Sequence, residues 1–181
     1  MIELTWGIWV TGLPGSGKSS IARQLRTRLR IMGIDVMSLE LDKIRKVVTP
    51  EPTYTEEERV IVYRALAYMA HKLTQVNMNV IIDATANKQE FRDLARELIP
   101  RFLEVYVKCP LDEAMKREKR RIVRYSPKGI YNKGKTGESK TVPGLNVDYE
   151  IPPNPEVVIE SDKVSVSEGV HSILSAIELM Y

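Results

Sequence analysis

The octapeptide GLPGSGKS at residues 12–19 places the strongest constraint on what this chain can fold into. It matches the pattern G-x-x-x-x-G-K-[ST] at every fixed position. Glycines let a backbone wrap closely around a polyphosphate with its N–H groups pointing inward, and a helix N-terminus favours the bound anion. The apolar run at residues 8–11 predicts a buried strand before the turn, and the apolar spacing over residues 21–32 predicts a helix after it. This pattern needs a strand, a glycine-rich turn and a helix, and the sequence predicts all three.

Two side chains at the end of the turn carry the chemistry expected of it. Lys18 is placed to reach the β- and γ-phosphates of ATP, and the Ser19 hydroxyl is placed to ligate Mg²⁺. A glycine-rich turn without a ligand has no need of either residue, so we expect ATP and Mg²⁺ as cofactors. The candidate nucleotide-binding residues are Gly12, Leu13, Pro14, Gly15, Ser16, Gly17, Lys18, Ser19 and Ser20.

Length and composition narrow the function further. The chain has 181 residues, of which 43% are hydrophobic and 28% charged, so we expect residues 1–181 to form one domain. A net charge of +3 suits a small polyanionic ligand but is too weak to predict nucleic-acid binding. We find no signal peptide and no run that predicts a membrane span. Cys109 is the only cysteine in the sequence, which excludes an internal disulfide and favours the cytoplasm.

Predicted strands alternate with predicted helices along the chain. We expect strands within residues 1–11, 35–39, 80–83, 102–107 and 157–160. Alternation of this kind predicts an α/β fold, a doubly wound parallel five-stranded sheet with helices on both faces. Ligands bind at the carboxyl edge of such sheets. Asp83 ends an apolar strand at that edge, so it is a candidate to hold Mg²⁺ through water.

A long helix is predicted after Thr55. Thr55 and Glu58 form a capping-box pattern, with a hydroxyl at the cap and a carboxylate three residues later. The next helix is expected to be capped by Asn87 and Glu90. The predicted core stripe of the long helix consists of Val62, Leu66, Met69, Leu73 and Val76.

Residues 122–155 differ in character from the rest of the chain. Glycine and proline punctuate the segment, lysine and arginine are interleaved, and no apolar periodicity is present. A basic stretch that includes Arg117, Arg120 and Arg121 leads into it. We expect a lid loop that closes over the phosphates and excludes water, the alternative being a solvated mobile loop.

The middle and C-terminal parts of the chain resemble the adenylylsulfate kinases. Residues 128–133 read KGIYNK where that family reads K-G-L-Y-K-K, and residues 152–156 read PPNPE where it reads P-x-N-P-E. Residues 39–45 and 54–59 also line up with family motifs, so the resemblance covers nearly the whole chain. It implies a P-loop NTPase-type fold and transfer of the ATP γ-phosphoryl group to the 3′-hydroxyl of adenylylsulfate, the kinase step of sulfate assimilation. It also implies a small-molecule nucleotide substrate and often a homodimer.

The resemblance further assigns roles to individual residues. Asp42 would orient or deprotonate the acceptor hydroxyl, or bind Mg²⁺ through water, and Tyr54 would stack on the acceptor adenine. Arg117 would pack near the ATP base. The residues implied to bind the acceptor are Asp42, Arg45, Tyr54, Arg59, Arg64 and Lys128.

The departures from the family pattern concern the acceptor side. Residues 40–43 read ELDK where the family reads D-G-D-N, a second stacking aromatic is replaced by Val142, and a serine often phosphorylated in the family is Ala86. About six residues are inserted around positions 122–127. These changes leave two alternatives open: a kinase of the same fold with another hydroxyl acceptor, such as a nucleoside, nucleotide or small alcohol, and a nucleotide-binding protein without transfer activity.

Overall fold

A five-stranded, wholly parallel sheet lies at the centre of the protein. The structure, a computed structural model, describes residues 5–122 and 127–180. The strands of the sheet run in the order β2-β3-β1-β4-β5. Strand β1 lies at the centre and pairs with β3 through Ile8 and Ile81 and with β4 through Ile8 and Leu103. The strands are β1 (Gly7–Thr11), β2 (Val36–Glu40), β3 (Asn79–Asp83), β4 (Phe102–Lys108) and β5 (Val157–Glu160). The predicted fold class is confirmed, although β1 begins at Gly7, and residues 1–4 lie outside the described residues.

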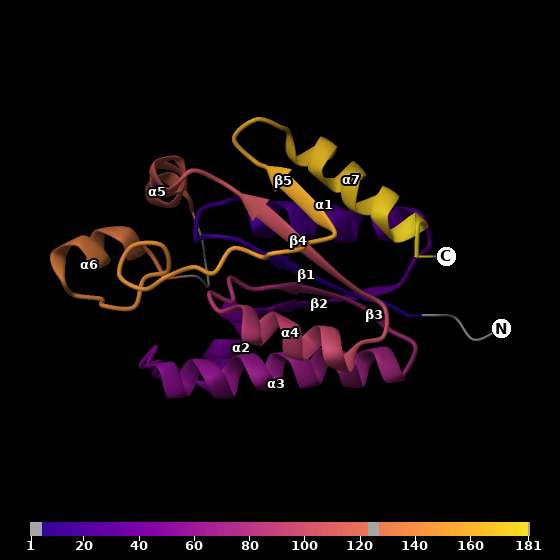
Figure 1. The fold of residues 1–181 in the computed structure, drawn as a ribbon, viewed down its shortest axis with the longest axis horizontal. Coiled ribbons are helices and arrows are strands. Elements are labelled where there is room, and N and C mark those ends of the chain that lie inside the picture. Colours follow the sequence, from indigo (N-terminus) through magenta and orange to yellow (C-terminus); the bar gives the residue numbers. More distant parts are fainter. Residues whose placement is uncertain (1–4, 123–126, 181) are drawn as a thin grey trace.

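Helices cover both faces of the sheet. They are α1 (Lys18–Ile31), α2 (Leu41–Val48), α3 (Glu56–Gln75), α4 (Gln89–Leu98), α5 (Leu111–Arg120), α6 (Ile130–Thr136) and α7 (Val166–Glu178). Helices α1 and α7 pack together on one face, while α3 and α4 pack on the other (Figure 1). Each face buries its own apolar core, one around Leu25 and Ile173 and the other around Leu66 and Ile82.

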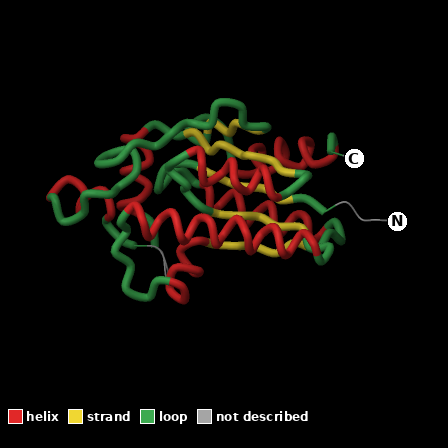
Figure 2. Tube along the Cα trace, turned by 60° about the horizontal axis from the view of Figure 1, so that its bottom comes forward, coloured by secondary structure: helices red, strands yellow, loops and turns green. Residues whose placement is uncertain are grey.

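The connections place a crevice at the carboxyl edge of the sheet. After β1 the chain continues into α1 on one face of the sheet, and after β3 it continues into α4 on the other face. The two connections diverge, so a crevice forms at the carboxyl ends of β1 and β3. Helices α5 and α6 lie beyond this edge (Figure 1), and much of the loop structure gathers there (Figure 2). No helix in the described part of the chain has the length and apolar character needed to cross a membrane.

The buried face of α3 differs in part from the predicted stripe. The Thr55 hydroxyl caps the helix by accepting the Glu58 N–H, and Leu66 is fully buried, as expected. Met69 and Val76 were predicted wrongly, because 36% and 70% of their surfaces are exposed. The helix packs on β3 and α4 together, so its buried face extends instead to small or polar residues: Ala67, Ala70 and Thr74.

Residues 122–155 are not all loop. The short helix α6 forms between Gly129 and Gly137, which both adopt left-handed backbone conformations with φ 63° and 79°. Sequence periodicity missed it because a helix this short buries only Tyr131 and Gly134, too few positions to repeat. Residues 123–126 of the predicted lid lie outside the described residues.

Candidate active site

The glycine-rich turn after β1 leaves no room for side chains at two of its glycines. A Cβ on Gly12 would lie 2.5 Å from the Val107 carbonyl oxygen, and one on Gly15 would lie 2.2 Å from that of Ala114. The loop is thus pressed against β4 and α5, and Gly15 adopts φ +83°, which favours glycine. Helix α1 begins at Lys18 with no side-chain cap. Its first N–H groups are therefore available to an anion.

Two cavities meet beside this turn. The first, of about 670 Å³, extends from Gly15 and Lys18 toward Arg117 and Ser161. The second, of about 550 Å³, extends to the other side toward Arg45, Tyr54, Arg59 and Val142. The residues that line both are Lys18, Ser19, Leu41, Asp42, Asp83 and Arg121. The arrangement provides one compartment for a phosphoryl donor, one for an acceptor, and a shared boundary where a group can pass.

Asp83 lies at this boundary, and one of its carboxylate oxygens accepts no hydrogen bond from the described residues. The carboxylate is buried, and its Oδ1 atom has no hydrogen-bond partner among the described residues. Burial raises the pKa of Asp83, while Lys18 and a hydrogen bond from Ser19 act in the opposite direction. No group of three or more histidine, cysteine, aspartate or glutamate side chains suited to a metal occurs in the described ranges. The pair of Ser19 and Asp83 instead fits Mg²⁺, which binds through one or two protein oxygens, phosphates and water.

Asp42 reaches the boundary from the end of β2, the strand next to β3. It lies in the first turn of α2, directly after β2, and lines both cavities. The neighbouring Glu40 and Lys43 form an ion pair at 2.6 Å between Oε1 and Nζ. Asp42 therefore faces both the donor and the acceptor compartment, as Asp83 does.

Arg45 and Tyr54 form one wall of the second cavity. The Arg45 guanidinium lies 5.1 Å from the centre of the Tyr54 ring, in cation–π geometry, and pairs with Glu58. Arg45 is buried, and burial raises the pKa of the half-buried Tyr54 phenol. The arginine and tyrosine singled out in the sequence therefore lie against each other where an aromatic, anionic acceptor would bind.

Arg59 ties three parts of this wall together. Its guanidinium donates to the Tyr54 carbonyl at 3.2 Å, to Asn87 Oδ1 at 3.0 Å and to the Thr141 carbonyl. Asn87 therefore does not cap α4, whose N-cap is Lys88 without a side-chain hydrogen bond. Sequence reasoning missed this use of Asn87 because the two partners are separated by 28 positions in the chain.

Arg117 lines the first cavity and braces the phosphate loop. Its Nη1 and Nη2 atoms donate to the Ser161 hydroxyl at 3.2 Å and the Ser161 carbonyl at 3.0 Å. Ser161 in turn donates to the Ser16 carbonyl at 2.7 Å. From the lid side, the buried Tyr131 hydroxyl donates to the Pro14 carbonyl at 2.8 Å. The loop is thus held from both sides.

Comparison with known proteins agrees with this geometry. A family model described as adenylylsulphate kinase matches residues 5–160. The chain belongs to the adenylylsulphate kinase family.

Two curated relatives and one solved structure illustrate the match. A probable adenylyl-sulfate kinase of Archaeoglobus fulgidus is 38% identical over 160 residues, which cover 88% of this chain and 98% of the relative. Another, of Pyrococcus abyssi, is 37% identical over 175 residues and covers 96% of each chain. The structure of the Mycobacterium tuberculosis APS kinase CysC in complex with AMPPNP and APS superposes with a TM-score of 0.86 at 28% identity, covering 96% of this chain and 98% of that one.

Two residues suggested by the adenylylsulphate kinase resemblance lie away from the paired cavities. Arg64 is exposed on α3 and lines neither of them. Lys128 lines a separate cavity of about 320 Å³ between α5 and α6, together with Glu118 and Tyr131. Their roles in acceptor binding stay predictions.

The family departures are spread over the site: Glu40 and Lys43 line the first cavity alone, and Ala86 lines neither cavity. Val142 is buried and lines the second cavity. Ala86 is fully buried with φ 42°, and its N–H donates to the Tyr63 hydroxyl at 3.0 Å. The hydrogen bond to Tyr63 therefore holds the backbone at Ala86 in place.

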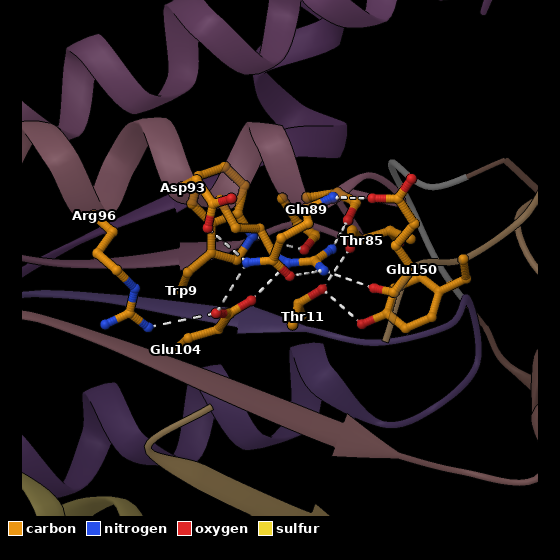
Figure 3. A network of polar contacts seen from close by, with 12 residues as sticks. Trp9, Thr11, Thr85, Gln89, Asp93, Arg96, Glu104 and Glu150 are labelled. Atoms are coloured by element: carbon orange, nitrogen blue, oxygen red, sulfur yellow. Dashed lines mark hydrogen bonds and ion pairs between the residues drawn. The ribbon is translucent and has the colours of Figure 1, made fainter. Parts of the chain in front are cut away.

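A buried ionic network behind the site was missed by sequence reasoning. The fully buried Arg92 donates from Nε to Glu104 Oε1 at 2.6 Å, and from its other nitrogens to Gln89, to the Ala86 carbonyl and to the Glu150 carbonyl. Thr11 links the end of β1 to Thr85 and Tyr149 within the same network (Figure 3). The available signal was a charged residue within each of two apolar segments, Arg92 between Phe91 and Ala95 and Glu104 within β4.

Proposed function

We propose that this chain is an ATP-dependent kinase that transfers the γ-phosphoryl group to the 3′-hydroxyl of adenylylsulfate, giving 3′-phosphoadenylylsulfate. One observation carries the proposal: the donor and acceptor cavities share Lys18, Asp42 and Asp83 at their boundary. Family membership supports the reaction class, and the named relatives support the acceptor. The proposed role is the kinase step of sulfate activation and assimilation.

The proposed mechanism assigns a task to each side chain at the boundary. The phosphate loop binds the ATP phosphates through its backbone N–H groups, and Lys18 pairs with the β- and γ-phosphates. Ser19 and Asp83 would hold Mg²⁺, which would supply positive charge beside the phosphates. Asp42 accepts the hydroxyl proton of the acceptor as its oxygen bonds to phosphorus. Arg117 packs beside the ATP base.

The acceptor compartment recognises the proposed substrate through charge and stacking. Tyr54 stacks on the adenine, and Arg45 beside it supplies positive charge for the phosphosulfate group. Arg59 shapes the compartment and adds positive charge, because its hydrogen bonds hold Tyr54 and Thr141 in place. Arg64 and Lys128 are proposed to contribute only after the lid or the bound acceptor brings them near.

The direct test is turnover with purified protein. Incubation with Mg-ATP and adenylylsulfate is expected to yield ADP and 3′-phosphoadenylylsulfate in equal amounts, separated by ion-exchange chromatography. Nucleosides, nucleotides and small alcohols serve as matched alternative acceptors and are expected to give little ADP. ATP binding without turnover of adenylylsulfate would reject the proposal, and rapid ADP release with another alcohol would name a different acceptor.

We also propose that the protein works in the cytoplasm as a homodimer. Its single cysteine, Cys109, is a free buried thiol, which suits a reducing compartment. Ile61 and Tyr68 on α3 are 65% and 57% exposed and provide an apolar surface for a second copy to cover. Sedimentation equilibrium tests the dimer, and a mass of one chain at micromolar concentration would contradict it.

A further inference from the structure

Arg121 lies on the boundary between the two cavities, at the end of the helix that packs on the phosphate loop. It follows the last residue of α5 and lines both the donor and the acceptor cavity. Each other residue that lines both cavities belongs to the sheet side of the site, at the start of α1, the start of α2 or the end of β3. Arg121 therefore borders the shared boundary from the α5 side, whereas the other shared residues border it from the sheet.

The Arg121 guanidinium is only partly satisfied by the protein. Its Nη2 atom donates to the Pro127 carbonyl at 3.3 Å. Its Nε atom is buried and has no hydrogen-bond partner in the described part of the chain. A buried N–H without an acceptor is costly, and a bound ligand oxygen would remove that cost. The guanidinium groups of Arg45, Arg59 and Arg117, in contrast, are each fixed by carboxylate or carbonyl oxygens.

The position of Arg121 in the sequence adds a second argument. It immediately precedes residues 122–127, which are inserted relative to the usual spacing of the family motifs. Arg117, the arginine that matches the family pattern on α5, is already committed to Glu113 and Ser161. Arg121 thus adds a cation that the motif pattern alone does not provide.

We propose that Arg121 is a further catalytic residue, which donates hydrogen bonds to the γ-phosphoryl oxygens during transfer. In that step the bond between phosphorus and the β–γ bridging oxygen breaks, the bond between phosphorus and the acceptor oxygen forms, and Asp42 takes the acceptor proton. ADP leaves with the bridging oxygen and its electron pair. Arg121 forms and breaks no covalent bond. It stabilises the charge on the equatorial oxygens of the γ-phosphoryl group, as an arginine does in other phosphoryl transfers. The inference rests on the proposed function for the identity of the acceptor only.

The test compares Arg121→Ala with Arg120→Ala, a matched variant one position earlier. Arg120 is exposed and lines neither cavity, so its removal is expected to leave kcat within about twofold of the wild type. Arg121→Ala is expected to lower kcat by about 10²- to 10³-fold. ATP affinity measured by equilibrium dialysis is expected to change by less than about threefold. Added guanidinium at millimolar concentration is expected to restore part of the lost rate, and Arg121→Lys to keep part of it.

A structural role for Arg121 predicts different results. If its bond to Pro127 only ends α5, Arg121→Ala would lower the melting temperature and raise both KM values, with kcat unchanged and no rescue by guanidinium. That outcome, or equal activity of the two alanine variants, overturns the inference.

The wild type separates this inference from the proposed function. If it hydrolyses ATP but does not phosphorylate adenylylsulfate, the acceptor assignment fails. The two alanine variants are then compared by ADP release, where loss in Arg121→Ala alone supports the inference and equal release overturns it. A wild type with neither activity overturns both.

Discussion

At the scale of single residues, the carboxylate of Asp42 carries the sharpest mechanistic prediction. It faces both cavities and lies outside the glycine-rich turn proposed to bind the phosphates. Asp42→Asn keeps the shape of the side chain but removes its capacity to accept a proton, so we expect kcat to fall by about 10²-fold or more while ATP affinity stays within about threefold. Steady-state kinetics and ATP binding measure the two effects, with exposed Asp112→Asn as the control. An effect confined to ATP binding would move Asp42 to the donor side.

A second residue-scale prediction concerns the tight contact of the loop with α5. Gly15→Ala places a Cβ on the Ala114 carbonyl, so the loop or the helix must move. Gly33→Ala is the matched control, because Gly33 has a similar φ of +77° but a Cβ added there would meet no atom within 4 Å. We expect the Gly33→Ala control to lose only about 1 kcal/mol of stability, from the strain of an alanine at positive φ. Gly15→Ala should in addition lower ATP affinity at least about tenfold. Equal ATP affinity in the two variants would contradict the tight contact.

At the scale of elements, Glu58 joins α2 to the start of α3. Its carboxylate accepts from the Thr53 N–H at 2.6 Å, from the Thr53 hydroxyl at 2.8 Å and from Arg45. Burial raises the pKa of Glu58, but these hydrogen bonds outweigh it and leave the pKa below its usual value. A lowered folded-state pKa stabilises the fold at neutral pH, and that stabilisation is lost as the pH falls through the folded-state value.

Glu58→Gln tests this connection. We expect it to lower the free energy of unfolding by about 1–2 kcal/mol at pH 7 and to raise the KM for the acceptor, because Arg45 loses its partner. The gap to the wild type should narrow as the pH falls from the usual glutamate pKa through the lower folded-state pKa of Glu58, since both side chains are then neutral. Urea denaturation across that pH range measures it, with exposed Glu57→Gln as the control. A gap that is the same at acid and neutral pH would show that the charge is not involved.

The elements also show which features can be predicted from sequence. The phosphate loop, the parallel α/β sheet and the Thr55 cap of α3 are local or periodic, and the structure confirms them. The site walls are not local: Arg59 bonds to Thr141, 82 positions away, and no sequence period encodes such a pair. The prediction that Met69 is buried was wrong for a related reason. The elements that pack on a helix, and not its apolar spacing alone, decide which of its faces is buried.

At the scale of the whole molecule, one buried ion pair joins the sheet, a helix layer and the end of the 122–155 segment. Arg92 on α4 binds Glu104 on β4 and also the Ala86 and Glu150 carbonyls (Figure 3). The Glu104 N–H donates to Glu156, which holds Arg96 as well. The backbone after β3 borders the acceptor cavity. It is therefore positioned by the buried charges of Arg92 and Glu104.

Removal of one partner of this pair is expected to weaken the whole fold. Arg92→Met leaves the Glu104 carboxylate buried without its main partner, so we expect the free energy of unfolding to fall by about 3–5 kcal/mol. That is a large share of the about 5–15 kcal/mol typical of a domain. The double variant with Glu104→Leu removes both charges and should recover a substantial part of the loss, because no unpaired charge remains. Denaturant unfolding of the two variants measures the coupling, and equal losses in the single and double variants would show that the unpaired Glu104 carboxylate is not the cause of the loss.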